Sequence, residues 1–158
     1  MPTVGLGTDK LIDTLIHPKV IYDAIVEGGY RLLDCATVYK NEELVGQAID
    51  KAIKENKVTR EDLFIITKLD MNDFADPERA LKESLTKLKV DYVDTYLIHW
   101  PAAFFTAKSE NRIPLHVLWP RLEALVEKGY IKSIGVSNFN VQILCDMLLY
   151  CKIKPVMN

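Results

Sequence analysis

The sequence has little cysteine and no long apolar run. Its three cysteines, Cys35, Cys145 and Cys151, are odd in number and lack CxxC spacing. The pattern predicts free thiols, with neither a disulfide framework nor a zinc site. No apolar run approaches the ~18 residues that a membrane span needs, and no basic flank with an apolar core opens the chain. We therefore expect a cytoplasmic protein with no membrane partner.

An excess of charge of one sign is also missing. Twenty Lys and Arg stand against 22 Asp and Glu, which gives a net charge of −2 without any basic block. Nucleic-acid binders depend on clustered cations that release counterions, so no nucleic-acid partner is expected. The chain also lacks a GxxxxGK phosphate loop, an HExxH metal motif and a nucleophile elbow. Its 49% hydrophobic content predicts one globular domain over residues 1–158.

Six short runs of strand-forming residues alternate with helical patterns. The runs are 4–8, 31–34, 63–68, 93–99, 131–137 and 155–157. Strands that alternate with crossover helices predict a parallel sheet, since such helices return the chain to the same edge. Two architectures fit this α/β pattern, an open doubly wound sheet and a (β/α)₈ barrel. The pattern alone does not separate them.

Local signals mark where the helices between these runs begin and end. Asp76, followed by a proline, is a typical cap for one helix, and Asn140 could cap another. Asn41 is a candidate cap for the helix that carries Leu44 and Ile49. Pro120 is tolerable only in the first turn of its helix, because proline lacks the N–H that later turns require.

Polar side chains collect where the predicted strands end. Parallel strands bring their carboxyl ends to one rim, and ligands bind at that rim in both candidate architectures. These positions are Thr8, Asp34, Lys68, His99, Ser137, Asn138 and Asn158.

Four residues, three at strand ends and Tyr39 in the loop after one of them, suggest chemistry when they are taken together. Lys68 ends an apolar strand, where an amine needs a carboxylate partner, and Asp34 on the neighbouring strand can supply it. Singly, Asp34 could be a turn residue, Tyr39 a packing residue and His99 a structural histidine. Jointly, an ammonium beside a tyrosine stabilises the phenolate, which makes the phenol a usable general acid. A neutral His99 could orient a substrate oxygen, and acid-assisted chemistry at a carbonyl is therefore predicted.

The segment GGYRLLDCATVYKNEELVG closely resembles a signature of the aldo-keto reductase family. The segments ITKL, LIHWP and LEALVEKGYIKSIGVSNF resemble three further blocks of that family in the expected order. The resemblance implies a (β/α)₈ TIM barrel, of which this chain would hold roughly the first six βα units. It also implies an NADPH cofactor and the reduction of an aldehyde or ketone to an alcohol by a monomeric enzyme.

The resemblance assigns roles by position. Tyr39 would be the proton donor, Lys68 and Asp34 would tune it, and His99 would orient the carbonyl. The expected cofactor-binding residues are Gly7, Thr8, Asp34, Ser137 and Asn138. The expected substrate-binding residues are Val38, His99 and Trp100.

The chain departs from the family pattern at several points. Cys35 replaces a serine or threonine, and Asp9 and Asp70 stand where many relatives have pocket tryptophans, which favours a polar or small substrate. The barrel would be incomplete at the C-terminus, so residues 1–158 alone are expected to be inactive. Two alternatives stay open: a catalytically inactive fragment, and a reductase-like subunit that binds nucleotide as a sensor.

Overall fold

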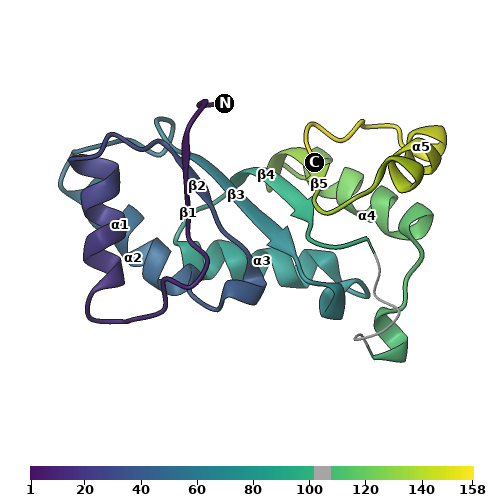
Figure 1. Ribbon diagram of the computed structural model, residues 1–158, viewed down its shortest axis with the longest axis horizontal. Helices are drawn as coiled ribbons and strands as arrows, with labels where there is room; N and C mark the ends of the chain where they lie inside the picture. Colours follow the sequence, from purple (N-terminus) through teal and green to yellow (C-terminus); the bar gives the residue numbers. More distant parts are fainter. Residues whose placement is uncertain (102–107) are drawn as a thin grey trace.

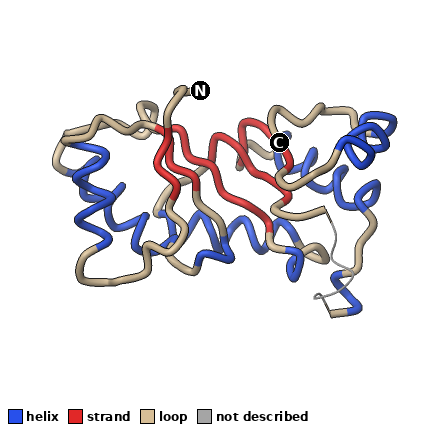
Figure 2. The backbone as a smooth tube through the Cα atoms, in the orientation of Figure 1, coloured by secondary structure: helices blue, strands red, loops and turns tan. Residues whose placement is uncertain are grey.

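The strands of the protein form one parallel sheet. The structure is a computed structural model that describes residues 1–101 and 108–158. In this part of the chain five strands pair in chain order, and each pair is parallel. Figure 2 shows them side by side in the middle of the molecule. The strands are β1 (Gly5–Gly7), β2 (Leu32–Asp34), β3 (Phe64–Leu69), β4 (Val93–Ile98) and β5 (Ile131–Val136).

One helix follows each strand, as the sequence predicts (Figure 1). The α-helices are α1 (His17–Val26), α2 (Glu42–Lys54), α3 (Pro77–Leu88), α4 (Leu115–Glu127) and α5 (Val141–Tyr150). The described residues also form the short 3₁₀ helices η1 (Thr37–Tyr39), η2 (Met71–Asp73) and η3 (Ser109–Asn111). Two predicted caps are confirmed, because Asp76 accepts a hydrogen bond from the backbone of Arg79 and Asn140 accepts one from Ile143. No helix in the described residues has the length and apolarity that crossing a membrane would require.

The two faces of the sheet have different roles. Leu33, Ile65, Tyr96 and Ile134 lie fully buried on one face, in the core that the sheet shares with its helices. Side chains alternate along a strand, so the neighbouring positions lie on the opposite face. There Gly7, Asp34 and Ile66 are aligned across β1, β2 and β3, and Lys68 is aligned with Leu97 of β4. This second face carries the chemistry-bearing side chains.

Three details of the sequence prediction are wrong. Residues 155–157 do not form a sixth strand, although Val136 donates to the carbonyl of Met157 and Val156 donates to that of Ile134. Two backbone bonds beside β5 are too few for a ladder, so the described residues contain five strand and helix units. Pro120 lies in the second turn of α4, since that helix already begins at Leu115.

The third correction concerns Asn41. It occupies the N-cap position of α2 but makes no cap bond with its side chain. Its amide instead donates to the carbonyls of Thr8 and Leu11 at 2.6 and 3.1 Å. The side chain therefore fastens the loop after β1 to the start of α2.

Candidate active site

Lys68 is the centre of a polar cluster at the carboxyl end of the sheet. It is only 4% exposed, and its Nζ lies 2.6 Å from Oδ1 of Asp34. The same ammonium donates to the carbonyl of Cys35 at 2.9 Å and to the hydroxyl of Tyr39 at 3.1 Å. Three oxygen partners compensate the cost of burying this charge. The predicted pairing of Lys68 with Asp34 is confirmed.

Tyr39 reaches the cluster because the chain turns sharply after β2. Residues 37–39 form η1, and Lys40 closes it in the left-handed region with φ of 56°. The hydroxyl of Thr37 donates to the carbonyl of Lys68 at 3.1 Å, which ties the turn to β3. The phenol of Tyr39 and the ammonium of Lys68 are thus held by neighbouring strand ends.

His99 lies directly beside Tyr39. Its backbone N–H donates to the carbonyl of Leu69 at 3.1 Å, so the residue follows β4 while still tied to β3. The imidazole meets the ring of Tyr39 edge to face, with 5.7 Å between centroids, and stacks on Trp100 at 6.4 Å. Burial lowers the pKa of His99, and the charge of Lys68 lowers it further. A neutral imidazole is therefore favoured at this position.

The residues after β5 continue the same rim. The side-chain amide of Asn138 donates to the carbonyl of His99 at 2.8 Å and to the hydroxyl of Ser137 at 3.1 Å. Thr8, fully buried, donates from its hydroxyl to the carbonyl of Asp34 at 3.0 Å. A Cβ added to Gly7 would meet nothing within 4 Å, so open space lies over the end of β1. Gly7 and Thr8 therefore lie at one edge of the five-stranded sheet, and Ser137 and Asn138 lie at the other.

Of the remaining predicted residues, two lie beside the cluster and one does not. Val38 and Trp100 are about half exposed beside the cluster, as residues that line an open pocket would be. Asn158, in contrast, uses its amide to bond the backbone N–H and carbonyl of Phe139. It therefore fastens the loop after β5 and does not join the cluster.

Sequence reasoning missed Glu42 at the start of α2. This carboxylate is 2% exposed and accepts hydrogen bonds from the hydroxyls of Thr67 and Ser84 at 2.6 and 3.0 Å. Burial raises its pKa, and the two hydroxyls oppose that shift. Through these bonds Glu42 links α2 to β3 and α3, at the strand residue next to Lys68. Glutamate is common in the first turn of a helix, so the sequence gives no clear sign that Glu42 is buried. The preceding residue, Asn41, is also polar and is the one nearby signal.

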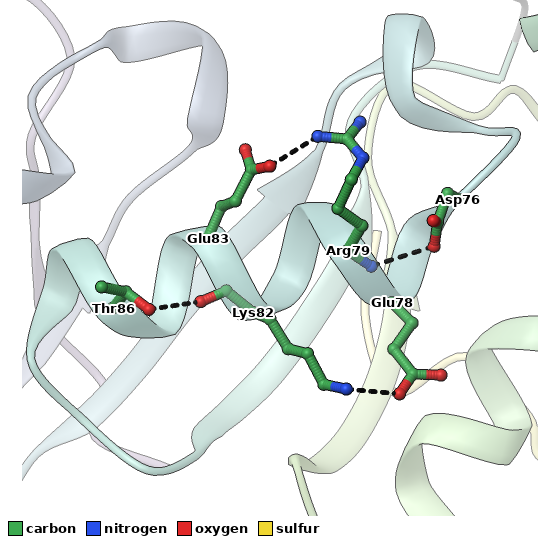
Figure 3. Close-up of a pocket in the computed structure, with 6 residues that line it drawn as sticks. All are labelled: Asp76, Glu78, Arg79, Lys82, Glu83 and Thr86. Carbon is green, nitrogen blue, oxygen red and sulfur yellow. Dashed lines mark hydrogen bonds and ion pairs between the residues drawn. The ribbon is translucent and has the colours of Figure 1, made fainter.

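A hollow on the outer surface of α3 offers a poorer site (Figure 3). Its charged side chains are paired along the helix itself, Lys82 with Glu78 at 2.8 Å and Arg79 with Glu83 at 2.6 Å. Nothing there is left to recognise a ligand. The described part of the chain also holds no group of His, Cys, Asp or Glu that could bind a metal ion.

Fold and site together define a class of protein. A parallel α/β sheet carries a tyrosine, a lysine, an aspartate and a histidine at its carboxyl ends. Residues 7–158 match the Aldo/keto reductase family, and the chain belongs to that family.

Curated relatives agree with the family assignment. The chain is 42% identical to the NAD(P)H-dependent D-xylose reductase of Kluyveromyces lactis over 180 residues, covering 99% of this chain and 54% of that protein. It is also 42% identical to the NADPH-dependent aldose reductase of Saccharomyces cerevisiae, covering 99% and 54%. The chain thus spans about half the length of the curated relatives it matches.

Solved structures agree with the fold. The aldo-keto reductase of Bombyx mori, solved in complex with NADP, matches with a TM-score of 0.89 and 38% identity over 99% of this chain and 53% of that one. The aldose reductase of Giardia lamblia matches with a TM-score of 0.86 and 38% identity over 96% and 54%. The five strands and their helices therefore correspond to about half of the (β/α)₈ barrel of this family.

Proposed function

We propose that the complete polypeptide reduces an aldehyde or ketone to an alcohol with NADPH, and that Tyr39 donates the proton. The observation that carries this proposal is the contact of 3.1 Å between the hydroxyl of Tyr39 and the ammonium of Lys68. Asp34 pairs with that ammonium at 2.6 Å, which offsets the cost of burying it. The named relatives support the reaction class, since they are NAD(P)H-dependent reductases of D-xylose and aldoses.

The cofactor would lie over the ends of β1 and β5. Ser137 and Asn138 supply hydroxyl and amide groups that suit the nicotinamide carboxamide, and the open space at Gly7 suits the ring. Thr8 and Asp34 would line the same place. When bound, the reduced nicotinamide supplies a hydride to the carbonyl carbon.

The residues of this chain act on the carbonyl oxygen. His99, whose pKa is lowered by burial, would donate a hydrogen bond to that oxygen as a neutral imidazole and so orient it beside Tyr39. As negative charge develops on the oxygen, the phenol of Tyr39 transfers its proton and the alcohol forms. Lys68 then stabilises the phenolate at 3.1 Å until a proton from solvent restores the phenol. Val38 and Trp100 would wall the substrate.

The test follows nucleotide and product together. We expect the complete polypeptide to convert an aldehyde to its alcohol with one NADPH oxidised for each alcohol formed. Tight binding of NADPH without any alcohol would contradict the proposal and would favour the alternative of a nucleotide-sensing subunit.

A further inference from the structure

Two carboxylates at the rim have no cationic partner in the part of the chain that the structure describes. Asp9 follows Thr8 after β1, and Asp70 follows Leu69, the last residue of β3. Asp70 keeps an extended backbone, with φ of −74° and ψ of 145°, so it continues the face on which Lys68 lies two residues earlier. Both carboxylates thus belong to the edge of the sheet that carries the candidate active site.

Two neighbouring acids, Asp34 and Asp73, form ion pairs with cations of the chain. Asp34 pairs with Lys68 at 2.6 Å, and Asp73 pairs with Arg79 at 2.6 Å. The carboxylate of Asp70 accepts hydrogen bonds from Asn72, from its backbone at 2.9 Å and from its side chain at 2.7 Å, and both donors are neutral. Within residues 1–101 and 108–158, neither Asp9 nor Asp70 takes part in an ion pair.

The charge of these carboxylates reaches the reacting position. Lys68 disfavours a proton on His99, whereas Asp70, Asp34 and Asp9 favour one. Asp9 and Asp70 thus place two negative charges near the imidazole that no ion pair within residues 1–101 and 108–158 offsets. His99 itself is 8% exposed, and its Nδ1 has no partner in the described part of the chain.

We propose that the substrate carries a positively charged ammonium group a few carbon atoms from its carbonyl, and that Asp9 and Asp70 select it. The inference rests on the proposed function, because it takes the same site as the place where the carbonyl binds. Trp100, 49% exposed and stacked on His99, offers an aromatic face that also favours a cation. A neutral sugar could bond the same carboxylates, and the test separates the two cases.

The probes are two aldehydes of equal shape and different charge. In 4-(trimethylammonio)butanal a nitrogen cation stands where 5,5-dimethylhexanal has a quaternary carbon, and D-xylose serves as the neutral polyol. The variants are Asp9→Asn, Asp70→Asn and the double variant, since asparagine keeps an acceptor and can still cap η2. Asp91→Asn is the matched control, because Asp91 is an exposed acid at the opposite end of the sheet.

We expect the complete polypeptide to prefer the cationic aldehyde over its neutral isostere by about fivefold to tenfold in kcat/KM, as two partly exposed charge pairs would give. The double variant should reduce this preference to less than twofold, and Asp91→Asn should retain it. Raising the salt to 1 M should weaken the preference in the wild type, since exposed charges are screened.

A binding measurement separates failure of this inference from failure of the proposed function. Tryptophan fluorescence is followed while either aldehyde is added in the presence of NADP⁺, which cannot deliver a hydride. No turnover of any aldehyde would contradict the proposed function alone, provided that the cationic aldehyde still binds more tightly. Equal affinity for the two isosteres would overturn the inference, as would a preference for D-xylose that the double variant removes.

Discussion

The two ends of the sheet both carry buried charges, but they compensate them differently. At the amino ends, Asp94 accepts from Arg60 and from the backbone of Ile65, each at 2.9 Å, and its other oxygen lies 3.3 Å from Lys132. The cations of Arg60 and Lys132 also lie 4.0 and 4.1 Å from the ring centroid of Tyr92. Both oxygens of this carboxylate are thus occupied by the protein itself.

The carboxyl ends leave groups available. The hydroxyl of Tyr39 accepts a hydrogen bond from Lys68, and Nδ1 of His99 has no partner in the described residues. Asp9 and Asp70 take part in no ion pair within residues 1–101 and 108–158. In parallel α/β proteins one end of the sheet serves stability and the other serves chemistry. We therefore expect substitutions at the carboxyl ends to lower the reaction rate, and substitutions at the amino ends to lower the free energy of unfolding.

The largest effect is expected for Tyr39→Phe at the carboxyl end. The change removes the phenolic proton and leaves Ser137 and Asn138 untouched, so carbonyl reduction should fall by about 10²- to 10⁴-fold while NADPH binding persists. Steady-state rates and a fluorescence titration with NADPH measure the two quantities. Tyr92→Phe at the amino end is the control and should keep its rate. Turnover of Tyr39→Phe within about threefold of the wild type would exclude the residue as proton donor.

Asp94→Ala should show the opposite behaviour. The substitution leaves Arg60 without its carboxylate in a place where its side chain is 14% exposed, and breaking such a pair costs about 3 kcal/mol of unfolding free energy. Urea denaturation of Asp94→Ala and Asp94→Asn measures the loss, which asparagine should partly restore because it can still accept from Ile65. A loss below about 1 kcal/mol would mean that this cluster contributes little to stability.

Lys68→Met should lower the rate of carbonyl reduction by about tenfold. This factor corresponds to the loss of one interaction of about 1.4 kcal/mol, here the contact of the ammonium with Tyr39. It should also change the pH profile of the reaction, since the phenolate of Tyr39 loses its cation. Asp34→Asn acts through the same contact at 2.6 Å, so the double variant should lose less than the product of the two single losses. An unchanged pH profile in Lys68→Met would assign the lysine a structural role only.

Much of the carboxyl end could be predicted because the rule behind it is simple. Parallel strands end at one rim, so Asp34, Lys68 and His99 were expected to meet, and an amine at the end of an apolar strand required the carboxylate that it has. The caps Asp76 and Asn140 were equally local signals, and the bonds that confirm them involve residues three positions on.

The parts that sequence missed depend on contacts between distant residues. Glu42 resembles any exposed first-turn glutamate until Thr67 and Ser84 are seen to donate to it. Asn41 has the sequence pattern of a helix cap, but its side-chain amide donates to the carbonyl of Thr8, 33 residues earlier. Arg60 and Asp94, 34 residues apart, gave no motif at all. Side-chain partners of this kind are set by packing, which no local pattern encodes.

The smallest effect concerns the protonation of His99. Burial first, and Lys68 second, lower the pKa of His99 in the folded protein. The unfolded chain therefore binds this proton more readily, and stability is lost as pH falls from the ordinary histidine value of about 6.5 through the lowered folded value. His99→Gln cannot titrate, so its unfolding free energy should fall less than that of the wild type between pH 7.5 and 5. Urea denaturation at several pH values tests this, with His116→Gln on α4 as the control. Parallel curves for the wild type and His99→Gln would show that burial of this imidazole does not control its proton, and the neutral form assigned to it at the carbonyl would lose its support.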